Sequence, residues 1–306
     1  MVGSMSLLIQ REKKVDFGAP TTDVRNWWDV TKGPAMPDLF QFIDDIDADK
    51  QAMVVKRLED RAQMPKFAAI RENYFDRIGL PISGRIHELG CGTGAVCRAI
   101  ASRPGFAGKV VGSDLSASLI ETAKQLTATS GLKNIEYYQA DGQGSDAHKG
   151  QYDLVLAHTV ISHVSDPAAL LREAIRLARP GGQIILHDGD YASMTFGTNM
   201  PELDHKMPGL ILQAVVANRY IMREIPRLLR QLDAKITHTF GDVVMEIGNG
   251  EYFPGLAKNF GPIAVSSGFA IQSEFDQWIV SIDHALSENT FFGSCNYVTY
   301  GLIKAS

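Results

Sequence analysis

The feature that most constrains this chain is a regular alternation of predicted strands and helices, with a glycine run directly after the first strand. Short apolar segments typical of strands lie at residues 85–89, 109–113, 135–139, 152–157 and 183–187, and helical segments separate most of them. Such alternation predicts a parallel sheet with helices on both faces. Ligands of these sheets bind at the carboxyl ends of the strands, so functional side chains are expected there.

The rest of the chain divides around this α/β core. Apolar residues recur at helical spacing within residues 1–80, which we expect to form a helical N-terminal arm and cap. Residues 81–190 and 233–306 are assigned to one doubly wound, mostly parallel sheet of seven strands, because β-rich composition returns after residue 233. Residues 191–232 interrupt the rhythm with prolines among helical stretches, and we expect a helical lid insertion over the sheet.

Composition argues against several functional classes. The chain carries 30 Lys and Arg residues against 35 Asp and Glu residues, a formal net charge of −5. A protein that binds nucleic acid phosphates or an anionic membrane surface usually carries an excess of positive charge, which this chain lacks. The cysteines Cys91, Cys97 and Cys295 form no metal-binding pattern, and so sparse a set is typical of a reducing compartment. No apolar run approaches the roughly 20 residues of a membrane span. We therefore expect a cytoplasmic protein that binds neither nucleic acid nor membrane.

The glycine run joins the first strand to a helix with the sequence Glu88-Leu-Gly-Cys-Gly-Thr-Gly94. Glycines allow a sharp turn and let a ligand approach backbone N–H groups, although a simple strand-to-helix turn needs them as well. Asp114 ends the second strand, 20 residues after Gly94, where a carboxylate can accept both hydroxyls of a ribose. The Gly90-x-Gly92-x-Gly94 spacing is shorter than the dinucleotide fingerprint, which favours a ligand with a single nucleoside.

Asp141 ends the third strand, where its carboxylate could reach an adenine amino group. Together, the Glu88–Gly94 run, Asp114 and Ala140-Asp141 resemble the successive motifs of class I S-adenosylmethionine-dependent methyltransferases. Three further segments resemble the subgroup of small-molecule methyltransferases related to ubiquinone and menaquinone biosynthesis (the type 11 domain): Tyr152-Asp-Leu-Val155, His163-Val-Ser-Asp-Pro167 and Leu177-Ala-Arg-Pro-Gly-Gly182. The resemblance implies the methyltransferase fold and S-adenosyl-L-methionine as the cofactor.

The resemblance also implies a role for each matching residue. Glu88, Gly90 and Gly92 would face the methionine part of the cofactor, and Gly94 would complete their loop. Asp114 would hold the ribose, Leu115, Asp141 and Gly142 would lie around the adenine, and His158 and Thr159 would lie beneath the sulfonium.

Methyl transfer from a sulfonium depends mainly on positioning, because the positive charge already activates the leaving group. A base is needed only if the acceptor must lose a proton. His163, after the fourth strand, is the first candidate for a catalytic base, although it could equally cap the next helix. His158 and His187, at strand ends, compete for that role. Asp188 and Asp190 could bind a metal, but an exposed acidic turn is the favoured interpretation and no metal is expected.

The expected lid carries candidate acceptor-binding residues. Arg219 and Arg223 are four residues apart and therefore share a helical face. Two guanidinium groups on the pocket side would suit an acidic acceptor, since arginine binds carboxylates bidentately; a solvated face beside Glu224 is the alternative. Arg61, in the N-terminal helical region, is open to the same two interpretations. We expect O-methylation of a small organic acid or phenol held under the 191–232 lid.

Several alternatives stay open from the sequence. The acceptor could be a carbon or nitrogen atom of a secondary metabolite or quinone precursor, or the fold could bind the cofactor without methylating. A nucleic acid or protein methyltransferase fits less well, because Ala157-His158-Thr159-Val160 replaces the Asx-Pro-Pro-aromatic motif of amino-methylating DNA enzymes. The apolar area of the N-terminal arm, including Trp27 and Trp28, suggests a homodimer.

Overall fold

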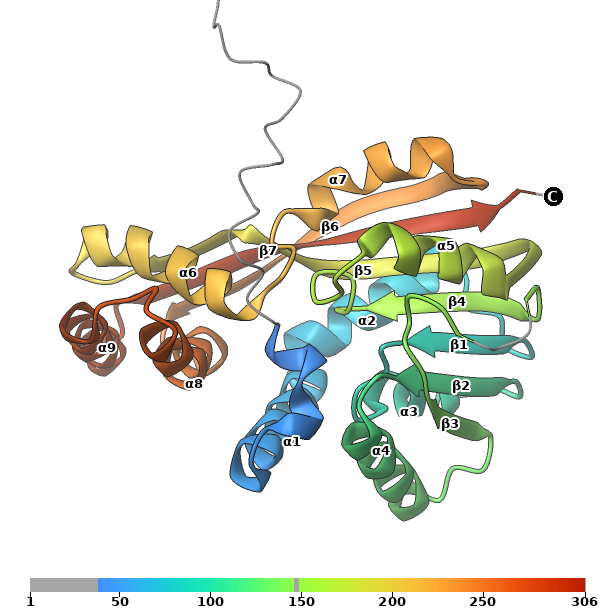
Figure 1. The fold of residues 1–306 in the computed structure, drawn as a ribbon, viewed down its shortest axis with the longest axis horizontal. Helices are drawn as coiled ribbons and strands as arrows, with labels where there is room; N and C mark the ends of the chain where they lie inside the picture. The colour runs from blue at the N-terminus through green and yellow to red at the C-terminus, as the bar shows by residue number, and fades with distance from the viewer. Residues whose placement is uncertain (1–37, 146–148, 306) are drawn as a thin grey trace, which may run out of the picture. The chain divides into compact units, whose positions relative to one another are not determined.

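The computed structural model describes residues 38–145 and 149–305, and Figure 1 shows their arrangement. The strands are β1 (Arg85–Leu89), β2 (Lys109–Asp114), β3 (Ile135–Gln139), β4 (Tyr152–His158), β5 (Ala178–Gly197), β6 (Ala234–Gly248) and β7 (Phe291–Lys304). The α-helices are α1 (Ala48–Gln63), α2 (Pro65–Ile78), α3 (Ala95–Ala101), α4 (Ala117–Ser130), α5 (Pro167–Leu177), α6 (Pro201–Val215), α7 (Ile221–Leu228), α8 (Tyr252–Ser266) and α9 (Gln272–Ser287). Short 3-10 helices are η3 (Leu39–Gln41), η4 (Ile43–Asp45) and η5 (Leu229–Gln231).

The seven strands form one sheet in the order β3-β2-β1-β4-β5-β7-β6. Neighbouring strands among the first five pair in parallel, whereas β7 is antiparallel to both β5 and β6. Residues 154–157 of β4 are fully buried, as expected of a central strand covered on both faces. The predicted doubly wound, mostly parallel, seven-stranded α/β fold is therefore confirmed.

Helices cover both faces of the parallel part of the sheet (Figure 1). On one face, α5 and α7 pack against Leu89, Val155 and Leu186. On the other face, α2 and α3 pack against neighbouring residues of the same strands, including Ile86 and Leu154. Successive strand residues point to opposite faces, so each continuous apolar strand contributes to two separate cores.

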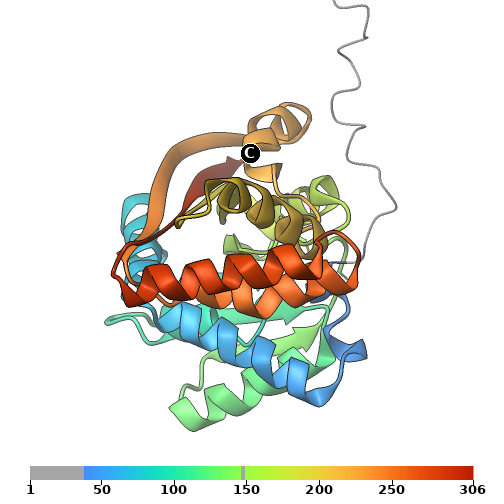
Figure 2. The same ribbon diagram turned by 90° about the vertical axis from the view of Figure 1, so that its left-hand side faces the viewer.

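The structure differs from the expected lid boundary. The fifth strand continues past residue 187 to Gly197 and stays paired with β7 as far as Phe292, so the expected boundary at residue 190 falls inside β5. Figures 1 and 2 show α6 beside α8 and α9 on the long ends of these strands. Their shared core includes Phe196, Met207, Phe253 and Trp278. Extended strands with apolar side chains need a covering layer, and α6 supplies part of that layer instead of a separate lid.

The N-terminal region is helical from residue 48 onward. Asp47 caps α1 by accepting a hydrogen bond from the Lys50 N–H group, and α2 begins at Pro65 and ends before Gly79, whose φ is +85°. Trp27 and Trp28, on which the dimer prediction rested, lie outside the described residues. Among the described helices, none combines the length and the apolar character needed to cross a membrane.

Candidate cofactor and acceptor site

The turn after β1 is built from three glycines with positive φ. The φ angles of Gly90, Gly92 and Gly94 are +66°, +53° and +73°, a region that disfavours residues with a Cβ atom. A Cβ atom on Gly90 would also lie 2.2 Å from Val160 Cγ2, so the turn has no room for a side chain there. A Cβ atom on Gly92 would meet no described atom closer than 3.4 Å, because this glycine faces an open cavity.

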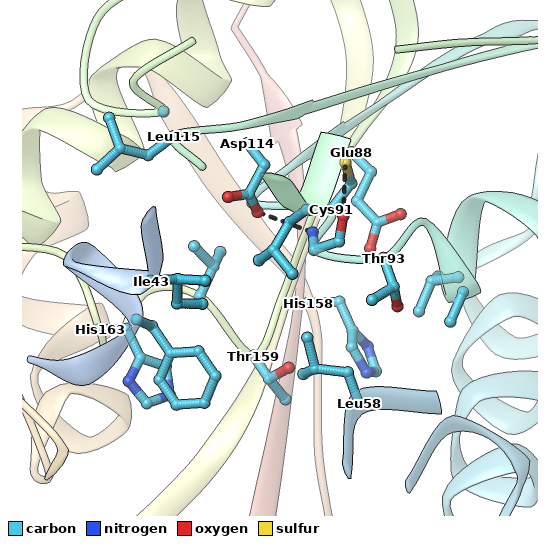
Figure 3. Close-up of a pocket in the computed structure, with 18 of the residues that line it drawn as sticks. Ile43, Leu58, Glu88, Cys91, Thr93, Asp114, Leu115, His158, Thr159 and His163 are labelled. Atoms are coloured by element: carbon cyan, nitrogen blue, oxygen red, sulfur yellow. Dashed lines mark hydrogen bonds between the residues drawn. The ribbon is translucent and has the colours of Figure 1, made fainter. Parts of the chain in front are cut away.

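The cavity lies at the carboxyl ends of β1, β2 and β4, and Figure 3 shows its lining. Predicted residues that line it are Glu88, Gly90, Gly92, Asp114, Leu115, Asp141, Gly142, His158, Thr159 and His163. Gly94 is absent from this lining; a Cβ atom there would lie 2.4 Å from the Tyr137 hydroxyl oxygen, so this glycine permits close packing behind the loop. The other main contributors are N-terminal: Phe40, Gln41, Ile43, Leu58, Arg61, Ala62, Phe67 and Arg71. Sequence patterns gave no signal for most of this N-terminal set.

Asp114 links the glycine turn to the next helix. One carboxylate oxygen accepts a hydrogen bond from the Gly92 N–H group at 2.8 Å, and the other accepts from the Ser116 N–H group at 3.0 Å. Each oxygen keeps a second acceptor position. Burial raises the pKa of Asp114 above its usual value. Beside it, Leu115 leaves 44% of its surface exposed, an unusual apolar patch at the cavity wall.

Glu88 is the most strongly perturbed acid of the cavity. Its side chain is buried, and the Cys97 thiol donates a hydrogen bond to Oε2 at 2.9 Å. Burial raises the pKa of Glu88 to about 8. A buried carboxyl group of this kind is suited to meet a cationic group of a ligand.

Thr159 follows β4 in a strained conformation. Its φ of +51° is rare for a β-branched residue, and strain of this kind collects at functional sites. The Thr159 N–H group donates to the His187 carbonyl oxygen at 2.7 Å, and its hydroxyl accepts from Arg61 Nη2 at 2.7 Å. The sequence gives no local sign of this conformation, because the long-range contacts impose it.

The rings of His158 and His187 stack on each other; His187 is buried and His158 is half-buried. Their ring centroids are 4.8 Å apart, the Tyr74 hydroxyl lies 2.9 Å from His158 Nδ1, and Thr299 Oγ1 lies 2.9 Å from His187 Nδ1. Burial lowers the pKa of His158 well below 6.5 and that of His187 to about 3. Both rings are therefore neutral at physiological pH, and only His158 lines the cavity.

His163 has the opposite environment. Its Nδ1 atom lies 2.8 Å from Asp38 Oδ2, and its ring packs on Phe40 at 4.5 Å between centroids. Burial by itself would lower the pKa of His163, but the Asp38 carboxylate outweighs it and raises the pKa above 6.5. The same carboxylate oxygen accepts from the Ala217 N–H group at 3.0 Å, which fixes its position. Asp38 was not foreseen, because nothing in its neighbourhood along the chain marks it.

The residues expected to hold the acceptor do not lie in the cavity. Arg223 forms two hydrogen bonds to the Asp190 carboxylate, at 2.8 and 2.9 Å. Arg219 donates to the Gly209 carbonyl oxygen at 3.2 Å and lies over the Tyr220 ring. Neither residue lines the cavity, so the structure lends no support to the expected acceptor contact. The physical reason is that both guanidinium groups are held by partners outside the cavity lining, Arg223 by Asp190 of β5 and Arg219 by the Gly209 carbonyl oxygen of α6.

Asp188 and Asp190 also differ from the sequence interpretation. Both belong to β5 and are buried, whereas an exposed acidic turn was expected. Asp188 accepts hydrogen bonds from the Ser162 hydroxyl and the Gly189 N–H group, and Asp190 pairs with Arg223.

Comparisons with known proteins agree with the class that the fold and cavity define. Residues 83–247 match the family described as methyltransferase domain, more than half of the chain. The chain belongs to this family, within the S-adenosylmethionine-dependent methyltransferases, whose cofactor is S-adenosyl-L-methionine. The predicted family resemblance and cofactor are thereby confirmed.

Two curated relatives show how far the similarity extends. The chain is 29% identical over 215 residues to an uncharacterised 37.1 kDa protein in transposon Tn4556 of Streptomyces fradiae, which covers 68% of this chain and 59% of that protein. It is 30% identical over 152 residues to the ubiquinone biosynthesis O-methyltransferase of Sodalis glossinidius, which covers 50% and 54%. The chain thus spans just over half the length of these relatives.

Solved structures share the fold at low identity. A provisionally assigned methyltransferase from Bacillus halodurans superposes with a TM-score of 0.56 at 15% identity, covering 77% of this chain and 99% of that chain. The YcgJ protein of Bacillus subtilis gives 0.51 at 14% identity, covering 77% and 98%. The [4+2]-cyclase SpnF gives 0.50 at 15% identity, covering 78% and 81%. At these identities the likeness establishes the fold alone.

The polar and apolar groups that line the cavity are of the kinds that S-adenosyl-L-methionine requires. Asp114 keeps free acceptor positions that suit ribose hydroxyls, and Leu115 offers an exposed apolar surface for an adenine ring. Glu88 can meet the amino group of the methionine part. Gly92 leaves open the space that a side chain would fill.

Proposed function

We propose that this chain transfers a methyl group from S-adenosyl-L-methionine to an oxygen atom of a small organic acid or phenol. The observation that carries the proposal is the Arg61 guanidinium in the cavity wall, which donates a hydrogen bond to the Thr159 hydroxyl and has no carboxylate partner among the described residues. A cationic amine would be repelled there, whereas an anionic oxygen would be attracted. The curated relatives named as ubiquinone biosynthesis O-methyltransferases support an oxygen acceptor as well.

The cofactor contacts that we propose follow the order of residues along the cavity. Glu88 would pair with the amino group of the cofactor, and Asp114 would accept the ribose hydroxyls. Leu115, Asp141 and Gly142 would surround the adenine, while Gly90 and Gly92 would lie against the methionine part and Gly94 would shape the turn. The bound cofactor supplies a methyl group on a cationic sulfur, beneath which His158 and Thr159 would lie.

His163 is the proposed base for an acceptor that must lose a proton. Asp38 occupies its Nδ1 side, so Nε2 is the nitrogen left to accept a proton from a phenol. A carboxylate is ionised at neutral pH and requires no base. His158 is a weaker candidate, because burial and the Tyr74 hydroxyl hold it as a neutral wall of the cavity.

A labelled-methyl transfer assay tests the proposal. The protein is incubated with cofactor and matched panels of carboxylic acids, phenols, amines and carbon nucleophiles, and both labelled product and S-adenosylhomocysteine are measured. Labelled methyl esters or methyl ethers are expected, in step with S-adenosylhomocysteine. Labelling of amines or carbon nucleophiles alone would contradict the oxygen assignment. Cofactor binding without S-adenosylhomocysteine formation on any panel would favour a methyltransferase fold that does not methylate.

The remaining expectations concern assembly and location. We propose a cytoplasmic homodimer that acts on a small molecule and not on nucleic acid. Composition and charge suggested the location and the kind of substrate, and the apolar area of the N-terminal arm suggested the dimer. The exposed apolar side chains Val243, Met245 and Ile247 on the edge strand β6 are compatible with a subunit contact. Light scattering that finds only a 33.5 kDa species at working concentration would refute the dimer.

A further inference from the structure

Arg61 lies on the wall between the cofactor cavity and a second cavity. The second cavity is lined by α1 and the start of α8: Met53, Lys56, Arg57, Asp60, Arg61, Gln63, Met64, Glu251, Tyr252, Gly255 and Asn259. Arg61 lines both cavities, and its Nη2 atom reaches Thr159, the strained residue at the end of β4. Its guanidinium group therefore sits where a second substrate would meet the cofactor.

The Arg61 guanidinium has spare hydrogen-bonding capacity. Within residues 38–145 and 149–305, its one hydrogen bond is to Thr159 Oγ1 at 2.7 Å, and no carboxylate oxygen lies within 4.0 Å. A guanidinium group has five N–H donors, and leaving them without partners in a half-buried position costs free energy. Asp188 is the acidic neighbour that contributes to the raised pKa of Arg61. The Asp188 carboxylate oxygens already accept hydrogen bonds from Ser162 and Gly189.

Phenol groups complete the surroundings of Arg61. The electrostatic neighbours of its guanidinium include the hydroxyls of Tyr191, Tyr252 and Tyr297, which are all buried. The Tyr252 and Tyr297 hydroxyls bond to each other at 2.8 Å. The Tyr191 hydroxyl forms no hydrogen bond with any described residue, but Tyr191 lines neither cavity. Burial raises the pKa of Tyr191 well above 10, which keeps that hydroxyl protonated.

Arg57 is the contrasting case, one helical turn earlier on α1. Its guanidinium lies 5.3 Å from the Tyr252 ring centroid and 4.7 Å from the Phe260 ring centroid. These cation–π contacts give it a role in packing α1 against α8. Arg61 lacks comparable aromatic stacking among the described contacts, which leaves ligand binding as the use of its free donors.

We propose that Arg61 binds the carboxylate of a small monocarboxylic acceptor that enters through the cavity between α1 and α8. This inference rests on the proposed function and narrows its acceptor to an acid. The planar Arg61 guanidinium can donate two hydrogen bonds to one carboxylate. The other cations of this cavity are engaged elsewhere, Lys56 with Asp60 and Arg57 over two aromatic rings. The place of Arg61 at the shared wall explains why an acceptor bound there would face the cofactor.

Matched carboxylate and amide probes test the assignment without turnover. The protein is saturated with S-adenosylhomocysteine, and dissociation constants are measured by ligand-observed NMR for benzoate and benzamide, phenylacetate and phenylacetamide, and 3-phenylpropionate and 3-phenylpropanamide. At least one carboxylate should bind about tenfold or more tightly than its amide. Arg61→Gln should reduce that preference to about twofold or less. Arg219→Gln, an arginine outside the cavity, should leave it unchanged.

The outcomes separate this inference from the proposed function. Equal binding of carboxylates and amides by the wild type, no carboxylate binding at about 10 mM (about 5.5 kcal/mol weaker than a micromolar ligand), or a preference that survives Arg61→Gln would overturn the inference, even if methyl transfer is observed. If the protein prefers carboxylates over amides through Arg61 but forms no methyl ester, the inference is supported and the proposed methylation of an acid is contradicted. If Arg61→Gln fails to fold, Arg61→Lys, which keeps the charge but loses the planar pair of donors, must weaken carboxylate binding about threefold or more with amide binding unchanged. An unaltered carboxylate dissociation constant would count against the site.

Discussion

At the scale of single residues, Glu88 offers a direct test of the cofactor site. Its pKa is raised to about 8 by burial, so the free protein holds a proton there at pH 7. The cationic amino group of a bound cofactor favours the ionised carboxylate and would release that proton. Binding should therefore release about one proton at pH 7, and affinity should rise between pH 6 and pH 8.

Calorimetry in buffers of different ionisation enthalpy measures this release. Glu88→Gln carries no titratable group and should bind S-adenosylhomocysteine with lower affinity, with no proton release from this site and a flatter pH dependence. Proton release that is the same in the wild type and in Glu88→Gln would show that Glu88 does not face the amino group.

Asp114 gives a second prediction at this scale. Asp114→Ala removes the acceptors for the ribose hydroxyls and should weaken cofactor binding by roughly 1.5–3 kcal/mol, the scale of hydrogen bonds to charged groups. Asp153→Ala is a suitable control, because Asp153 pairs with Arg179 on the far side of the fold from the cavity lining. Calorimetry that finds equal affinity in the wild type and Asp114→Ala would remove Asp114 from the cofactor site.

His163 distinguishes the two kinds of oxygen acceptor. His163→Gln should lower kcat for phenols by about 10²- to 10⁴-fold, the usual contribution of a general base, and leave carboxylates within a few-fold. The pKa of His163 lies above 6.5, and a general base must be unprotonated to act. Phenol turnover should therefore rise as the pH passes through the pKa of His163. Asp38→Asn removes the group that raises the pKa and should move the midpoint to lower pH. A pH profile that is unchanged in both variants would exclude His163 as the base.

At the scale of elements, the short segment η3–η4 closes the cofactor cavity. Asp44 accepts hydrogen bonds from the Ser116 and Ser118 hydroxyls at 2.6 Å and from the Ala117 N–H group at 2.8 Å, so it caps α4 from a distant part of the chain. Ile43 packs beside it against Val54 and Leu119. These contacts attach η3–η4, which lines the cavity, to α4, the helix that follows Asp114.

Removing this fastening should weaken cofactor retention. Asp44→Ala should cost about 0.5–2 kcal/mol of stability, as for other caps, and increase the dissociation rate of S-adenosylhomocysteine several-fold. Asp47→Ala removes the cap of α1 alone, so it should cost similar stability with little change in that rate. Stopped-flow dissociation and thermal melts measure both quantities. Equal dissociation rates in the two variants would argue against a closing role for η3–η4.

At the scale of the whole described fold, β5, β6 and β7 join two hydrophobic regions. The same strands flank the parallel sheet and support α6, α8 and α9, so the two regions should unfold together. Phe253 is fully buried beneath these helices, and Phe253→Ala should cost about 3–5 kcal/mol. Val280→Ala, at an exposed position of α9, should change stability by less than about 0.5 kcal/mol.

Circular dichroism and tryptophan fluorescence melts check both parts of this prediction. The two signals should give a single coincident transition that moves to lower temperature in Phe253→Ala. Separate transitions, with cofactor binding retained after the first, would show that the helices over the strand ends unfold independently.

The sequence predicted the core elements well because their signals are local. Strands β1 and β3 have the expected bounds, and β2 and β4 each extend one residue further. The length of β5 beyond residue 187 could not be foreseen, because its continuation depends on pairing with β7, which lies about 100 residues later in the chain. Polar and small residues such as Asp188 and Gly189 look like a turn until a partner strand satisfies their backbone groups.

The sequence by itself determined the part of the cavity that we propose for the cofactor. Gly90, Gly92 and Asp114 act through backbone turns and strand ends, and these depend on residues within one strand–helix unit. Only the tertiary structure decided the acceptor half. It brought Asp38 to His163 and Arg61 to Thr159, across 125 and 98 positions of the chain, and it placed Arg219 and Arg223 elsewhere. No local pattern specifies such pairs, because their contact energy arises only when the N-terminal helices pack over the carboxyl ends of the strands.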